Sequence, residues 1–453
     1  MRAAELAVRG GVLVLPEGER HADLLIDRGA FVAIVDPGEG ESANEIDASA
    51  LLVLPGMVDA HVHFNDPGRA DWEGWEAGSR GAAAGGVTTV VDMPLNSLPP
   101  TTTAASLDAK VAAASRASLV DFALWGGLVS ADPAPLRALH ERGVVGFKAF
   151  MSDSGVGEFP ALADDALADA LRAAASVGAL VAVHAEDQTM TRDGRERLRA
   201  DGRRDPGAWS ASRPVEAEVR AIERLGAAAR RGGGRVHVVH ASCAAAVDAV
   251  VREGERGADM TVETCPHYLV FDDADLRRVG PALKCAPPLR DAPAREVLWQ
   301  RLGDGAIDLV ASDHSPCAAE LKRRGDDDIW LAWGGIAGIQ STLPALLTEG
   351  VHRRSLSLSA LARISAESPA RRCGLADKGA IRVGADADLA IVDPERDWTL
   401  AEDDVQSRAR LSPYVGRRFR GAVVRTLVRG RVVWDEGAFP APPGWGRFVR
   451  RGG

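Results

Sequence analysis

The sequence predicts an α/β protein: a closed (β/α)8 barrel of the TIM type with a small β-sandwich domain built from both chain ends. In the middle of the chain, short apolar strands alternate with alanine-rich stretches of helical spacing, a pattern typical of parallel strands joined by helices. At both ends, short apolar stretches are broken by turns without helical spacing. Because 453 residues exceed the roughly 250–300 at which one core stops growing, a large and a smaller domain are expected.

The predicted sandwich takes residues 1–52 and residues 376–453. Its strand signals lie at residues 12–16, 23–29 and 31–35, and again at 387–392, 423–428 and 431–434.

The predicted barrel takes residues 53–375. Strands are expected at residues 88–93, 144–148, 180–184, 236–240 and 307–313, with helices at 164–176 and 215–231. A closed barrel is favoured over an open sheet because chemically active residue types end many of these strands, and barrels place functional residues there.

Composition excludes several classes of partner. The net charge is −10 and there is no basic tract, which argues against nucleic acid or an anionic membrane as the partner. The five cysteines are scattered without metal-ligand spacing, as expected of reduced thiols. No apolar run approaches the roughly 20 residues that cross a bilayer, and the first residues lack a signal-like segment. We therefore expect a cytoplasmic protein.

Histidines at strand ends predict a metal site. His61 and His63 are one residue apart after an apolar run, so in a strand both imidazoles point the same way. His184 and His240 each close a predicted strand, and Asp313 closes another. A single histidine in such a place is more often structural. Four of them with an aspartate at equivalent barrel positions favour a site for Zn²⁺ or a similar divalent ion.

Lys148 ends another predicted strand and is expected to be buried. Desolvation would then lower its pKa and favour the neutral amine, which can react with CO₂ to form a carbamate. The carbamate would be an anionic ligand with two oxygens, able to bridge two metal ions. Without the histidines, an ion-paired or snorkelling lysine would be the better interpretation.

These residues resemble the amidohydrolase superfamily, and within it the hydrolases of cyclic amides. The run at residues 55–63 is similar to the first-strand motif of the superfamily, and the resemblance extends over essentially the whole chain. Several segments of this chain resemble the allantoinase family more specifically: 65–69, 72–74, 92–97, 146–151, 312–317 and 333–338.

The resemblance implies a binuclear centre and a hydrolytic activity. His61, His63 and Asp313 would hold one metal ion, His184 and His240 the other, and carboxylated Lys148 would bridge them together with a hydroxide. Zinc is expected, although cobalt, manganese or iron would suit the ligands. Asp313 would also be catalytic, as the proton shuttle in opening the ring of allantoin to give allantoate in purine catabolism. The family also implies a homotetramer.

Substrate contacts are expected from the loops that follow the barrel strands, because backbone amides and carbonyls can read a planar ring. The residues predicted to bind substrate are Asn96, Ser154, Ala286, Gly334 and His314. The charged stretch at residues 320–328 is expected to be a solvated loop rather than a lid.

Three alternatives remain. Dihydroorotases usually carry an arginine where this chain has Asn65, and dihydropyrimidinases and hydantoinases usually carry a tyrosine where it has Asp153. Both differences favour allantoin as substrate. Some proteins with this fold are non-catalytic scaffolds, but such proteins usually lack several metal ligands, and here all six positions hold the expected residue type.

Overall fold

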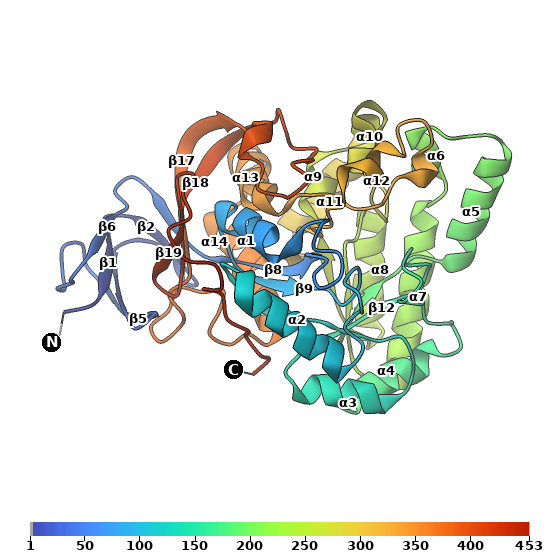
Figure 1. The fold of residues 1–453 in the computed structure, drawn as a ribbon, viewed down its shortest axis with the longest axis horizontal. Helices are drawn as coiled ribbons and strands as arrows, with labels where there is room; N and C mark the ends of the chain where they lie inside the picture. The colour runs from blue at the N-terminus through green and yellow to red at the C-terminus, as the bar shows by residue number, and fades with distance from the viewer. Residues whose placement is uncertain (1–2, 453) are drawn as a thin grey trace.

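The computed structural model describes residues 3–452, in which a barrel surrounded by helices adjoins a separate group of strands (Figure 1). Residues 1, 2 and 453, at the outer ends of the two predicted sandwich segments, lie outside the described part. Figure 1 shows β17, β18 and β19 from the C-terminal region beside the N-terminal strands. Within residues 3–452, no helix is both long and apolar enough to cross a membrane.

The barrel is built from parallel strands, with β10 and β11 following one another on either side of Trp125. It closes where the His63 N–H donates to the His314 carbonyl at 2.7 Å, beside a parallel bridge between Val62 and His314. The barrel strands are β8 (Met57–Val62), β9 (Val87–Asp92), β10 (Asp121–Leu124), β11 (Gly126–Gly127), β12 (Gly146–Phe150), β13 (Leu180–His184), β14 (Arg235–Val238), β15 (Asp259–Thr264) and β16 (Leu309–Val310).

Helices connect these strands, and both helices predicted from spacing are present. The longer one, α7, turns Ala221, Ile222 and Leu225 into the core, as its apolar spacing indicates. The α-helices are α1 (Gly74–Ala84), α2 (Ala104–Ala117), α3 (Pro133–Glu141), α4 (Leu167–Ala175), α5 (Gln188–Ala200), α6 (Pro206–Ala211), α7 (Val215–Gly232), α8 (Ala244–Glu255), α9 (Pro266–Val270), α10 (Asp273–Val279), α11 (Ala292–Gly303), α12 (Ala319–Arg323), α13 (Thr342–Ala345), α14 (Leu358–Ala362) and α15 (Ser368–Cys373). Single turns of 3₁₀ or π type are η1 (Gly280–Leu283), η2 (Ile329–Leu331), η3 (Ile339–Ser341), η4 (Leu346–His352), η5 (Arg363–Glu367) and η6 (Glu402–Asp404).

Two further sheets are formed by the chain ends. One has the strand order β5-β4-β1-β6, and the other, β19-β18-β17-β7-β2-β3, mixes strands from both ends, as predicted. Their strands are β1 (Leu6–Arg9), β2 (Val12–Leu15), β3 (Gly18–His21), β4 (Asp23–Asp27), β5 (Ala30–Val35), β6 (Glu45–Asp47), β7 (Leu52–Pro55), β17 (Leu389–Thr399), β18 (Arg418–Val428) and β19 (Arg431–Asp435). The domain boundaries at 52/53 and 375/376 stay a prediction.

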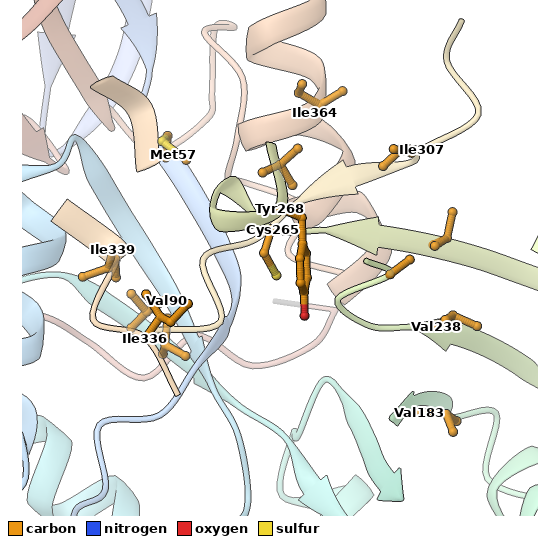
Figure 2. Packing of buried hydrophobic residues seen from close by; sticks show 14 of the residues in the cluster. Met57, Val90, Val183, Val238, Cys265, Tyr268, Ile307, Ile336, Ile339 and Ile364 are labelled. Atoms are coloured by element: carbon orange, nitrogen blue, oxygen red, sulfur yellow. The ribbon is translucent and has the colours of Figure 1, made fainter. Parts of the chain in front are cut away.

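A large apolar core lies between the barrel strands and the helices around them. Figure 2 shows part of it, with Cys265 and Tyr268 among isoleucine and valine side chains. The Tyr268 hydroxyl donates to the Pro287 carbonyl at 2.6 Å, so this buried polar group is satisfied. Burial raises the pKa of the Cys265 thiol well above its usual value. Cys265 is therefore an inert packing residue.

A buried ion cluster joins the start of β10 to the sandwich. The Lys378 ammonium lies 2.5 Å from an Asp121 carboxylate oxygen and 2.8 Å from Asp388, and Arg429 also pairs with Asp121. Asp121 begins its strand, so this cluster lies at the end of the barrel opposite the strand C-termini. Burial would lower the pKa of Lys378, but Asp388 and Asp121 outweigh it and raise that pKa.

Replacing Lys378 should destabilise the fold. Lys378→Met leaves two buried carboxylates without their shared cation, and we expect a loss of about 3–5 kcal/mol in the free energy of unfolding, measured by urea titration. Arg418→Gln, which breaks an exposed pair with Asp397, is the control and should cost less than about 1 kcal/mol. Equal effects of the two variants would contradict a structural role for the cluster.

Candidate metal centre

A cavity of about 430 Å³ opens where the barrel strands end at their carboxyl termini. All six residues predicted to bind metal line it: His61, His63, Lys148, His184, His240 and Asp313. All six are buried, so a charge at this position is shielded from bulk water.

Three of these residues already have the spacing of a metal site. The ligand atoms of His61, His63 and Asp313 lie within 4.8 Å of one another. An Asp313 carboxylate oxygen is 3.3 Å from Nε2 of His61 and 3.4 Å from Nε2 of His63. Ligands held about 2.0–2.1 Å from a tetrahedral zinc ion are about 3.3 Å apart, so this set fits such an ion. Asp313 has φ 45°, a strained backbone that turns its carboxylate into the cavity.

His184 and His240 form a second group beside the first. Nδ1 of His184 and Nε2 of His240 are 3.0 Å apart, so both nitrogens converge on one point. The other nitrogen of His240 has no partner in residues 3–452. Burial lowers the pKa of both rings, which favours the neutral form that binds metal. This pair fits a second ion.

Lys148 reaches the same cavity from β12. It is fully buried and its Nζ makes no hydrogen bond within the described chain. Burial lowers the pKa of Lys148 to about 8, against the opposing attraction of Glu263 and Asp313. A buried amine without a partner is costly, and this one is close enough to neutrality to react as a nucleophile.

Two glutamates that the motif search did not single out hold the histidines in place. Glu263 accepts from Nδ1 of His61 at 2.6 Å and from Nε2 of His237 at 3.0 Å. Glu186 lies 2.8 Å from Nε2 of His184 and pairs with Arg213. Such carboxylates fix the tautomer of a ligand histidine and make it more basic.

The two glutamates stay charged although they are buried. Burial alone would raise the pKa of Glu263, but His61 and His237 hold it at about 2. Arg213 and His184 do the same for Glu186. The available sequence signal was a glutamate near the end of β15 and another two residues after His184.

The predicted substrate residues differ in where they lie. Asn96, Ser154, Ala286 and Gly334 line the cavity, whereas His314 is not among its lining residues. The ring of His314 is buried elsewhere: Nε2 donates to Glu73 at 3.1 Å and Nδ1 accepts from the Gly338 N–H at 3.2 Å. The structure therefore does not bring His314 to the cavity with the other predicted substrate residues.

The charged stretch at residues 320–328 is also different from the predicted solvated loop. It begins with α12, and Leu321 and Arg324 line the cavity. Lys322 between them is buried. The stretch forms part of the cavity wall, and its Lys322 points inward and donates to the backbone carbonyl of Gly335.

Comparison with known proteins agrees with this geometry. The amidohydrolase family matches residues 52–433. The chain is 48% identical over 450 residues to an allantoinase of Rubrobacter xylanophilus, covering 99% of this chain and 98% of that one. It is 45% identical over 446 residues to an allantoinase of Deinococcus radiodurans, covering 98% of each chain. The chain belongs to the amidohydrolase family.

Solved structures of hydantoinases and dihydropyrimidinases resemble the chain. An L-hydantoinase (dihydropyrimidinase) from Arthrobacter aurescens superposes with a TM-score of 0.96 at 36% identity, covering 99% of this chain and 100% of that one. A dihydropyrimidinase from Brevibacillus agri gives 0.92 at 31% identity, covering 98% of each. The predicted barrel with an added β domain and the predicted resemblance are both confirmed, and the protein is a hydrolase of the class that acts on cyclic amides.

Loss of the Glu263 charge should weaken the metal centre. In Glu263→Gln, we expect about 10–100-fold weaker metal retention, because His61 loses the carboxylate that orients it. The measurement is metal content by mass spectrometry after dialysis against graded chelator. Glu253→Gln, at a buried glutamate that pairs with Arg230, is the matched control. Unchanged retention in Glu263→Gln would refute the orienting role.

Proposed function

We propose that this protein hydrolyses the ring amide of allantoin to allantoate, in purine catabolism. One observation carries the proposal: a chain 48% identical to an allantoinase over nearly its full length has two histidines and an aspartate that could hold a metal ion in the cavity at its strand ends. A scaffold protein has no need of neutral buried imidazoles and a free buried amine in one place.

The proposed centre holds two divalent ions, zinc by preference, with cobalt, manganese or iron as other options. His61, His63 and Asp313 would bind one ion, and His184 with His240 the other. Lys148 would bridge them as a carbamate, and its unpartnered Nζ and lowered pKa support this. When bound, the ions supply a hydroxide at neutral pH and polarise the ring carbonyl.

Within this reaction, Asp313 is the residue we assign to proton transfer. Its carboxylate lies at the junction of His61 and His63 and also lines the open cavity, so it reaches both the ligand set and a bound ring. Burial would raise the pKa of Asp313, but His61 and His63 keep it far below its usual value, so the group is ionised at neutral pH, which is the form that a proton acceptor requires. The proton then goes to the departing ring nitrogen.

Two residues of this chain favour allantoin over other cyclic amides as the substrate. Asn65 donates from its side chain to the Pro316 carbonyl at 2.9 Å and lies outside the cavity, so no cation stands there to clamp a ring carboxylate. Asp153 lines the cavity with a carboxylate where a phenol would be expected for dihydropyrimidines. A polar wall suits the ureido arm of allantoin.

We propose a cytoplasmic homotetramer as the working form. All five cysteines are buried and free, which suits a reducing compartment. Support for the tetramer is the family resemblance alone. Sedimentation velocity of the purified protein tests it, and a monomer or dimer would overturn it.

Removing Lys148 should abolish both metal binding and activity. Lys148→Ala deletes the proposed bridging ligand, so we expect metal content to fall from two ions per chain toward none. Added acetate or propionate should restore part of both, because a small carboxylate can occupy the vacated position. If the variant binds two metal ions per chain without an added carboxylate, the carbamate proposal is wrong.

Substrate choice is tested by kcat/KM for allantoin, dihydrouracil and dihydroorotate, on protein prepared with bicarbonate and a divalent metal. We expect allantoin to exceed each of the others by at least about 100-fold, or about 3 kcal/mol in transition-state binding. A preference for dihydrouracil would keep the metal chemistry and overturn the interpretation of Asn65 and Asp153. If none of the three reacts, the scaffold alternative takes precedence.

A further inference from the structure

Lysine is used in this chain only at buried positions. Five of its 54 basic residues are lysines, and all five are at most 5% exposed. Arginine supplies every other cation, including those on the surface. Each of the five amino groups is therefore shielded from water, which is costly unless it has partners, so each lysine calls for its own explanation.

Three of the five are explained by the residues they face. Lys148 lies at the metal centre. Lys110 pairs with Asp92, and Lys378 pairs with Asp121 and Asp388. The remaining two, Lys284 and Lys322, form no ion pair within residues 3–452, and both lie beside the cavity.

Lys284 ties one wall of the cavity to its neighbour. Its ammonium donates to the carbonyls of Ile329 at 2.8 Å and Ala332 at 2.6 Å. It also lies 4.2 Å from the centre of the Trp209 ring, whose indole N–H donates to the Cys285 carbonyl at 2.7 Å. Residues 329–335, called here the wall loop, are thus bound to the loop that begins at Lys284.

Lys322 secures the other end of the wall loop. Its ammonium donates to the Gly335 carbonyl at 2.5 Å and lies 3.5 Å from the Lys284 carbonyl. The Gly335 N–H donates to that same Lys284 carbonyl at 2.8 Å. Both sides of Gly335 are therefore held. A side chain at this position would collide with Ser315, so the close approach requires glycine.

The wall loop presents groups that its own contacts leave free. Gly334 lines the cavity, has open space around it, and makes no hydrogen bond to the described chain through its backbone. The indole N–H of Trp333 is likewise without a partner in residues 3–452. Leu331 is 57% exposed, so the loop runs from the cavity mouth inward. For a ring bound at the six predicted metal ligands, the wall loop forms one side of the surrounding cavity.

We propose that Lys284 and Lys322 are positioning residues that determine how the substituent on the cyclic amide is recognised. Resting on the proposed function, this means that they fix the Gly334 peptide and the Trp333 indole against the ureido arm of allantoin. Backbone carbonyls alone accept hydrogen bonds from these two amino groups, so each Nζ holds backbone of fixed shape and pairs with no carboxylate in residues 3–452. Loss of either lysine frees the loop but leaves the ligand set untouched.

The test compares two ligands in Lys284→Met and Lys322→Met, which keep the apolar stem and remove the ammonium. For allantoin, KM should rise at least about tenfold while kcat changes less than about threefold, because uniform binding of the arm is lost. The Ki of unsubstituted hydantoin, measured as a competitor, should change less than about twofold. Bound metal should be unchanged. Hydrogen exchange should speed up across residues 329–335 in both variants.

Lys378→Met is the matched control, measured at a temperature at which all three variants are folded by circular dichroism. It should lower the free energy of unfolding without altering the ratio of allantoin KM to hydantoin Ki. Equal weakening of allantoin and hydantoin, loss of metal, or unchanged exchange in the wall loop would each overturn the proposal. Turnover of allantoin by the wild-type protein tests the proposed function separately. The hydrogen-exchange result tests whether the two lysines hold the wall loop, whichever cyclic amide is the substrate.

Discussion

The hydrogen bonds of Glu263 are the interaction on which the centre depends. One buried carboxylate on β15 accepts from His61 on β8 and from His237 on β14, and so it joins three barrel strands. A buried charge is tolerated only when its partners are complete, and here those partners include a histidine predicted to bind metal. The same carboxylate therefore links barrel strands and orients a histidine that is predicted to bind metal. Glu186 repeats this arrangement for His184.

One end of the barrel contributes to stability, and the opposite end holds the candidate metal site. At the strand starts, Lys378 and its aspartates form a saturated ion cluster that attaches the sandwich. At the strand ends, Nζ of Lys148 and Nδ1 of both His63 and His240 have no hydrogen-bond partner in residues 3–452. A protein that only needed to fold would not keep such groups unsatisfied, because each of them reduces stability. Their cost is offset by packing and by the saturated cluster elsewhere.

The barrel and most of the predicted metal ligands could be inferred from the sequence. Buried parallel strands appear in a sequence as apolar runs, and the residue after each run lies at the carboxyl-terminal edge of the sheet. That logic found His184 and Asp313 without contact information. It could not find Glu263, since strand alternation does not say which imidazole lies opposite a glutamate 202 residues away. It misplaced His314, whose ring turns to Glu73 through a closure contact that only the three-dimensional fold creates. The role of Lys322 was hidden by the charged residues around it.

We propose that the cavity at the strand ends is a two-metal site bridged by carboxylated Lys148. The experiment is a crystal structure of the protein grown with bicarbonate and zinc, with anomalous data collected at the zinc edge. We expect two anomalous peaks, one between His61, His63 and Asp313 and one between His184 and His240. Density continuous with Nζ of Lys148 should connect them. A single peak beside an unmodified lysine would overturn the proposal.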